Sequence, residues 1–262
     1  MLDIVHSTVS LVAIILASTA AGSANNAGSA FFGIPVPGQT VSALEVFQLF
    51  DNMCRPQLNP YERRPSITNS LKFLSNSRGE ALAQRAYNSL YFAVGEVDVD
   101  KLMGRWFKVI TSPRVHQETC VVSYYKLLST ADYTATFTTR DYYRSGTTID
   151  MNEGFGTKIG PDAGQLLIDT GHPADHCPYS IVKTGPVNAD GQYSYVLLTQ
   201  LLKHPIIGLA RDPHEFDTLY RAELQEFLKK HNFNNPLTSA YNTIAFANWT
   251  KCPYEYYFDL DS

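Results

Sequence analysis

The stretch V-D-V-D-K-L-M-G-R-W-F-K-V-I-T, residues 97–111, decides the fold of this chain. It contains a glycine and a tryptophan two positions apart, Gly104 and Trp106, at the start of a strand-like run. Glycine lets the backbone enter a strand in close packing. Trp106 is one of only two tryptophans in the chain, and its large ring is suited to anchor a core. This triplet also fits a buried tryptophan in any β-protein, so the interpretation depends on the order of the segments that follow.

Seven further strand-like segments follow the tryptophan. The alternation of side chains is clearest in residues 133–143, where Tyr133, Ala135 and Phe137 share one face. Eight short antiparallel strands, separated by turns that hold glycine, proline and aspartate, predict an all-β fold, a closed up-and-down barrel without exposed edges. The predicted strands cover residues 105–111, 120–128, 133–143, 147–158, 165–170, 179–183, 192–200 and 205–211.

One amphipathic helix is predicted after the last strand. Asp212 is placed to cap it, Pro213 occupies the first helical position, and Glu215 completes a capping box with Asp212. An apolar stripe along this helix indicates that it packs against the outside of the barrel. The stripe consists of Phe216, Leu219, Tyr220, Leu224, Phe227 and Leu228.

The front of the chain carries a different pattern. An apolar run at residues 9–17, followed by small residues, is typical of a secretory signal peptide and is too short for a membrane span. A linker at 25–39 and amphipathic helices at 41–53 and 78–92 are predicted to follow. We therefore expect a secreted protein with no membrane span. Its predicted parts are a signal peptide, 1–24, a linker and helical extension, 25–96, a barrel with its helix, 97–252, and a tail, 253–262.

The order of these parts resembles the lipocalins, small antiparallel barrels that hold lipophilic molecules. The Gly-x-Trp strand, the seven strands after it, the segment G-L-A-R-D-P at 208–213, one helix and a late cysteine all follow that order. The long extension and the four cysteines are most similar to the nematode lipocalin-related secreted proteins, which have an apolipoprotein D-like barrel. The usual Thr-Asp-Tyr motif has no clean match, because Lys183-Thr184-Gly185 stands in its place. The chain is thus similar to the outlier lipocalins, and a receptor contact through that loop is not implied.

Four cysteines lie far apart in the sequence, at Cys54, Cys120, Cys177 and Cys252, without the close pairs of a zinc knuckle or a redox motif. In an exported chain they predict two disulfides, for which three pairings exist. The residues alone do not choose among these pairings. The resemblance implies that Cys120 pairs with Cys252, which leaves Cys54 for Cys177.

The barrel interior is the candidate functional site. An eight-stranded barrel encloses room for its own side chains or for one small ligand. An apolar inner face favours a lipophilic guest by about 25 cal/mol per Å² buried, and the resemblance implies a fatty acid, a sterol or a similar molecule. The alternative is a solid core filled by the same side chains. The predicted inward-facing residues are Tyr133, Ala135, Phe137, Ile181, Tyr195 and Leu197.

Three other positions carry specific expectations. The resemblance implies that Arg211 lies across the ring of Trp106, beside Gly104, and closes one end of the barrel with a cation–π contact. Asn248-Trp249-Thr250 is an acceptor triplet for N-glycosylation at Asn248. The segment G-H-P-A-D-H-C, residues 171–177, holds residue types that bind metals. A disulfide at Cys177 would remove its thiolate, so we predict neither a metal site nor a cofactor.

Composition and motifs narrow the function. A net charge of −4 and the lack of a basic run argue against a nucleic-acid partner. The sequence has no Gly-x-Ser-x-Gly elbow, no phosphate-binding glycine loop and no His-Glu-x-x-His, so we predict that the protein is not an enzyme.

Two functions remain. The first is a secreted carrier of a small lipophilic molecule, in the extracellular space or the apical extracellular matrix. The alternative is a matrix or interaction protein that uses the barrel as a scaffold and binds matrix proteins.

Overall fold

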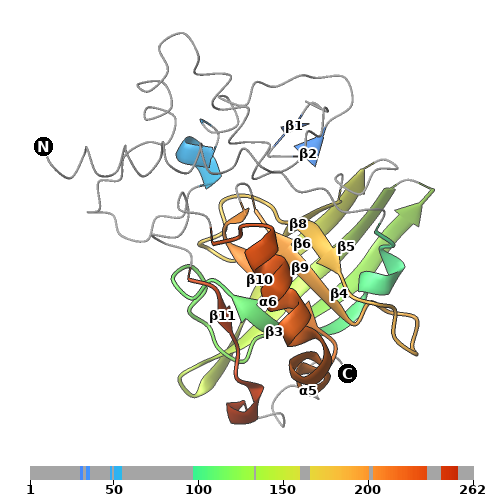
Figure 1. Cartoon of the computed structure of the whole chain (residues 1–262). Helices are drawn as coiled ribbons and strands as arrows, with labels where there is room; N and C mark the ends of the chain where they lie inside the picture. Colours follow the sequence, from blue (N-terminus) through green and yellow to red (C-terminus); the bar gives the residue numbers. More distant parts are fainter. Residues whose placement is uncertain are drawn as a thin grey trace, which may run out of the picture.

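The computed structural model describes residues 97–132, 134–159, 166–200, 203–234 and 243–252, with residues 30–31, 34–35, 48 and 50–54. Eight strands in this part of the chain form one antiparallel sheet (Figure 1), and each overlaps the strand predicted from sequence. The strands are β3 (Gly104–Thr111), β4 (Val122–Ala131), β5 (Thr134–Ser145), β6 (Thr148–Ile159), β7 (Leu166–Asp169), β8 (Ser180–Thr184), β9 (Tyr195–Thr199) and β10 (Ile206–Ala210).

The sheet nearly closes on itself. Its order is β7-β6-β5-β4-β3-β10-β9-β8, with antiparallel pairing throughout. The two end strands meet at a bridge between Ile168 and Tyr179, whose backbone N–H groups each donate to the other residue's carbonyl oxygen, at 2.9 and 2.7 Å. Closure removes the unpaired edges of an open sheet. The predicted fold class, an eight-stranded antiparallel barrel, is therefore confirmed.

One helical segment packs on the outside of the barrel, in front of β9 and β10 in Figure 1. It is built of α5 (Pro213–Glu215), η6 (Phe216–Tyr220) and α6 (Arg221–Lys230). The Asp212 carboxylate accepts hydrogen bonds from the backbone N–H groups of His214, at 2.7 Å, and Glu215, at 3.0 Å, which is the predicted cap. The Glu215 carboxylate accepts a hydrogen bond from the Tyr220 hydroxyl at 3.2 Å.

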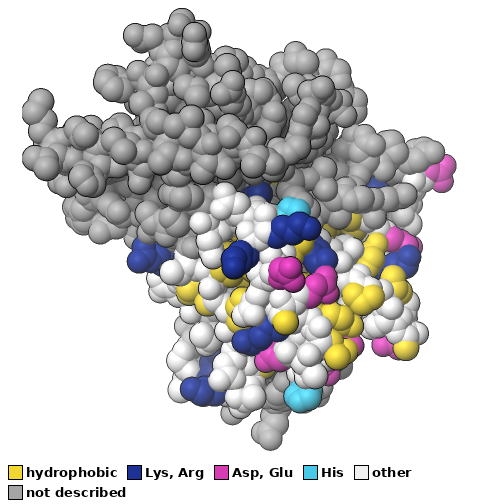
Figure 2. All heavy atoms as spheres, viewed as in Figure 1, with side chains coloured by type: hydrophobic (Ala, Val, Ile, Leu, Met, Phe, Trp, Pro, Cys, Tyr) yellow, Lys and Arg dark blue, Asp and Glu magenta, His cyan; other side chains and the backbone are white. Residues whose placement is uncertain are grey.

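The predicted apolar stripe of this helix is wrong at Leu219. Phe216, Leu224 and Leu228 are buried against the barrel, but Leu219 is 59% exposed. The reason is that η6 is a π-helical turn, whose wider i→i+5 spacing moves Leu219 off the buried face. In the space-filling view of Figure 2, charged side chains of both signs lie on the face of the molecule that carries the helix.

The front and the C-terminal segment, residues 243–252, differ from the sequence analysis in two places, and the described part of one predicted helix is helical. Strands β1 (Ala30–Phe31) and β2 (Ile34–Pro35) pair within the predicted linker. The described part of the predicted helix 41–53 consists of helical Gln48 and the π-turn η2 (Phe50–Cys54). In the C-terminal segment, where no strand was predicted, β11 (Ala245–Phe246) pairs with the end of β3, and a 3-10 turn, η7 (Trp249–Lys251), follows. The predicted signal peptide, 1–24, and the predicted helix 78–92 lie outside the described residues.

Two disulfides join these segments to the barrel. Cys120 pairs with Cys252 and Cys54 pairs with Cys177, the pairs that the family resemblance implied. The first disulfide, Cys120–Cys252, ties the C-terminal segment to the residues just before β4. The second ties η2 to the connection between β7 and β8. Among the described residues, no helix is long and apolar enough to cross a membrane.

Arg211 packs on Trp106 at the end of the barrel where β3 begins, which is called the closed end below. The guanidinium carbon of Arg211 lies 3.5 Å from the centre of the Trp106 ring. Its N–H groups donate to the carbonyl oxygens of Arg105, at 2.7 Å, and Met103, at 2.8 Å. Burial lowers the pKa of Arg211 to about 10, so the group stays charged at neutral pH. Gly104 has φ +96°, a left-handed conformation that favours glycine, and a Cβ there would come within 3.3 Å of the Arg211 Nη1 atom.

We predict that Trp106→Ala lowers the free energy of unfolding by about 3–5 kcal/mol, because it leaves a large cavity and removes the surface on which Arg211 rests. Urea denaturation with the disulfides intact measures the loss. Leu219→Ala, at an exposed helix position, is the control and should change the same quantity by about 0.5 kcal/mol or less. An unchanged urea midpoint for Trp106→Ala would contradict the structural role given to this ring.

Candidate functional site

Two apolar clusters lie on the two faces of the barrel wall. The inner cluster contains Ala135, Phe137 and Ile181, three of the predicted ligand-binding residues. They share it with the Trp106 ring at the closed end. Their contact with a ligand stays a prediction. The other buried members are Val97, Val99, Leu102, Tyr125, Leu166, Ile168, Tyr179, Tyr193, Val196, Leu198, Ile207 and Leu209.

Tyr195 and Leu197 were predicted to face inward, and the structure corrects this. Both belong to the outer cluster beneath the helix. The Tyr195 hydroxyl donates to the Glu223 carboxylate on α6 at 3.2 Å, and its ring packs against Phe216. All five residues of β9 are buried, since the helix covers the outer face, so apolarity does not distinguish the two faces of this strand. The inward positions of β9 are Val196 and Leu198. Tyr133, the remaining predicted residue, lies outside the described residues.

The inner cluster is densely packed in this structure. The side chains of Trp106, Phe137, Tyr179 and Leu198 have no measurable solvent exposure. The Phe137 ring lies directly on the backbone of β6, because a Cβ built on Gly156 would fall 1.9 Å from a ring atom. If a space large enough for a water molecule lay beside one of these four side chains, that side chain would have measurable solvent exposure. None has any, so protein atoms fill the region around them. A bound guest must therefore displace some of these side chains.

A polar band interrupts the apolar interior above Trp106. Lys108, two residues further along β3, forms an ion pair with Asp141 at 3.1 Å, and the two side chains are 6% and 7% exposed. Ser123 stands opposite both Trp106 and Asp141 in the strand register. Its hydroxyl is buried without a hydrogen-bond partner among the described residues. The interior therefore offers polar groups as well as apolar surface.

We predict that Lys108→Met costs about 3–5 kcal/mol of unfolding free energy, because it leaves the Asp141 carboxylate buried without its partner. The double variant Lys108→Met/Asp141→Leu should lose much less than the sum of the two single variants, since no uncompensated charge remains. A double-mutant cycle from urea denaturation measures this coupling. Additive losses would show that the ion pair does not act as a unit.

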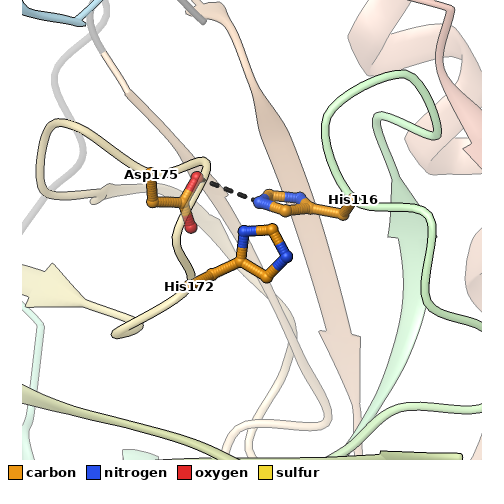
Figure 3. A group of neighbouring side chains, drawn as sticks. All are labelled: His116, His172 and Asp175. Atoms are coloured by element: carbon orange, nitrogen blue, oxygen red, sulfur yellow. Dashed lines mark hydrogen bonds and ion pairs between the residues drawn. The ribbon is translucent and has the colours of Figure 1, made fainter. Parts of the chain in front are cut away.

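A second polar cluster lies at the other end of the barrel. In an antiparallel barrel the connections after β3, β7 and β9 all lie at the end opposite the start of β3, where Trp106 stands. At that end the Asp175 carboxylate accepts hydrogen bonds from the Tyr179 hydroxyl at 2.7 Å and the Thr170 hydroxyl at 2.6 Å. It also forms a hydrogen bond with the His116 Nε2 atom at 2.9 Å (Figure 3). The Gln200 side-chain amide donates a further hydrogen bond to it at 3.2 Å. One carboxylate thus links the three connections.

His172 joins this open-end cluster through a second carboxylate. Its Nε2 atom lies 3.1 Å from the Glu118 carboxylate, and its Nδ1 atom accepts the Ala174 backbone N–H at 3.1 Å. Since Nδ1 accepts, the ring proton is on Nε2, and His172 donates to Glu118. Burial alone would raise the pKa of Glu118, but the hydrogen bond from His172 prevails and lowers it to about 2.

Burial and hydrogen bonding also act in opposite directions on the pKa values of His116 and Asp175. Burial lowers the pKa of His116, which outweighs its contact with Asp175. Burial would raise the pKa of Asp175, but hydrogen bonding from His116 lowers it overall. At neutral pH the carboxylate is charged and the His116 imidazole is neutral.

The sequence analysis singled out His172 and Asp175 but missed His116 and Glu118, which come from a connection far away in the chain. Cys177 is in a disulfide, as expected, and His176 is exposed. No local pattern could have joined residues of the two connections.

Asn248, the predicted glycosylation site, is exposed in the C-terminal segment. Its side-chain oxygen accepts hydrogen bonds from the backbone N–H and the hydroxyl of Thr250, at 3.1 and 2.6 Å, and caps η7. Its glycosylation stays a prediction.

The nearly closed eight-stranded barrel, with an arginine packed on a tryptophan at one end and one helix on the outside, defines a class of small antiparallel barrels. Residues 83–256 match the lipocalin domain. The chain therefore belongs to the lipocalin family.

Solved structures give distant matches to this chain. The major allergen Per a 4 from cockroaches is 17% identical, and the match covers 54% of this chain and 85% of that chain with a TM-score of 0.37. Japanin from Rhipicephalus appendiculatus, solved bound to cholesterol, is 15% identical, with coverage of 48% and 85% and a TM-score of 0.33. The siderocalin Ex-FABP, described as having dual ligand specificities, is 12% identical, with coverage of 56% and 93% and a TM-score of 0.35. No curated protein matches the chain.

Proposed function

We propose that this lipocalin binds a small lipophilic molecule, such as a fatty acid or a sterol, inside its barrel and carries it outside the cell. The observation that carries the proposal is the inner cluster, in which aromatic and aliphatic side chains of seven strands face one another in a protein of this family. Such a surface binds apolar guests by removing their surface from water, at about 25 cal/mol per Å². This role requires no catalytic group, and we propose no enzymatic activity.

The packing of the interior defines how binding would occur. Since Phe137 and its neighbours fill the region above Trp106, a guest replaces contacts among these side chains with contacts to itself. The polar band of Lys108, Asp141 and Ser123 lies within the same interior. An amphipathic guest with a hydroxyl or carboxyl group would complete the hydrogen bonding of Ser123 there. An alkane without a polar group would bind less well.

The same packing favours a second candidate function. A barrel filled by its own side chains is also a rigid scaffold, which suits a matrix or interaction protein whose partners bind its surface. For either function we propose an extracellular location, because two disulfides persist in an oxidising environment. The resemblance to nematode lipocalin-related proteins adds the apical extracellular matrix to this proposal.

We predict that the full chain, secreted from eukaryotic cells and purified without detergent, releases about one lipid molecule per protein on extraction with organic solvent. Mass spectrometry identifies and counts the lipid. Phe137→Asp should abolish the bound lipid, because it places a charge in the inner cluster, and Ala135→Phe should reduce it by occupying space without adding charge. Tyr195→Phe, on the outer face, is the matched control and should keep the lipid.

An empty extract from folded, disulfide-bonded wild-type protein, with no uptake of added oleate or cholesterol, would contradict the carrier and favour the scaffold. A lipid retained at full stoichiometry in Phe137→Asp would place the binding site outside the barrel. Near-UV circular dichroism checks that each variant is folded before its extract is interpreted.

A further inference from the structure

We propose that the open end of the barrel carries a binding site for a divalent transition-metal ion of the zinc type, with His116, His172 and Asp175 as its protein ligands. This site is separate from the inner cluster, and the proposal does not depend on whether the barrel holds a lipid. The two imidazoles and the carboxylate come from two connections, 112–121 and 170–179, that meet above the barrel.

The arrangement of the three side chains supports coordination of one ion. Figure 3 shows the Asp175 carboxylate and the two imidazole rings converging on a common space. One ligand atom from each residue lies within 4.8 Å of the others, and the two ring centres are 4.6 Å apart at 87°. Zinc binds nitrogen and oxygen at about 2.0–2.2 Å, so ligand atoms in a tetrahedral site lie roughly 3.3–3.5 Å apart. Ligand atoms that are up to 4.8 Å apart would have to move closer together to complete the site.

The neighbours of the three side chains match the outer shell of a metal site. His172 donates its Nε2–H to the Glu118 carboxylate, which fixes the ring and leaves the lone pair on Nδ1. That lone pair accepts the Ala174 backbone N–H at 3.1 Å, and an ion on Nδ1 would replace this hydrogen bond. A carboxylate behind a ligating histidine is the usual arrangement around bound zinc. Asp175 is held in the same way by the hydroxyls of Thr170 and Tyr179.

The hydrogen-bond network alone does not account for His116. Its side chain is 1% exposed, and its Nδ1 atom has no hydrogen-bond partner in the described part of the chain. Only Nε2 is used, in the contact with Asp175. An ion bound to Nε2 of His116 would replace the proton that Nε2 shares with Asp175. Nδ1 of the same ring can then carry that proton, so the imidazole stays neutral.

The ligand types favour a divalent transition-metal ion over magnesium or calcium. Two imidazoles and one carboxylate suit zinc, copper, nickel or ferrous iron, whereas magnesium and calcium prefer oxygen ligands. Three protein ligands leave a fourth position for water or for a polar group of another molecule. The predicted absence of a metal site rested on the loss of the Cys177 thiolate. His116, from the other connection, supplies the ligand that the cysteine cannot.

The test uses the full disulfide-bonded chain, freed of metal with EDTA and then desalted. Isothermal titration with zinc sulfate at pH 7.5 should show one ion per chain with a dissociation constant of about 10 μM or tighter, and magnesium should give no heat. His172→Asn should weaken zinc binding at least tenfold, as should Asp175→Asn. His176→Asn, an exposed histidine of the same segment, is the matched control and should bind zinc like the wild type.

A spectrum of the wild type provides a second test that needs no variant. Cobalt added to the metal-free chain should give the visible absorption bands of a tetrahedral complex, and zinc should displace them. Absence of these bands together with no zinc heat would overturn the proposal. Zinc binding that survives in His172→Asn but is lost in His176→Asn would also overturn it, because the ion would then occupy a surface site.

Discussion

The contact of Arg211 with Trp106 is the interaction on which the rest of the barrel depends. The guanidinium covers the indole ring and donates to carbonyl oxygens at the start of β3 and just before it, so one charged group joins the last strand to the first. This contact lies at the end of the barrel where Gly104, with a positive φ, leads the chain into the sheet. The connections at the opposite end carry the polar cluster around Asp175 instead.

The sequence predicted the strands because their signals are local: alternating side chains, glycine and proline in the turns, and Asp212 before the helix. The disulfide pairs came from the family resemblance. The orientation of β9 was wrong, because a strand covered by a helix is apolar on both faces. Leu219 was wrong because a π-turn changes the helical spacing. His116 was missed because only the closed barrel brings it to Asp175.

The two ends and the interior differ in how they are stabilised. In the middle of the barrel, Lys108 and Asp141 form a buried ion pair. At the closed end, the Arg211 guanidinium donates hydrogen bonds to backbone carbonyl oxygens. At the open end, Asp175 gathers hydroxyl, amide and imidazole donors from three connections, and the Cys54–Cys177 disulfide joins η2 beside it. This end combines a covalent tie with a polar network that an ion can reorganise. The carrier and the scaffold differ only in whether the inner cluster opens to admit a guest.

The most direct test of the central claim is to locate an added ligand by NMR on the full chain. Intermolecular NOEs between oleate and the methyl and aromatic protons of the inner cluster, including Phe137 and Ile181, are the result that the carrier requires. The Tyr195 ring, on the outer face, should show none. NOEs confined to outer-face residues, or no NOEs at saturating oleate with the protein folded, would contradict binding within the barrel.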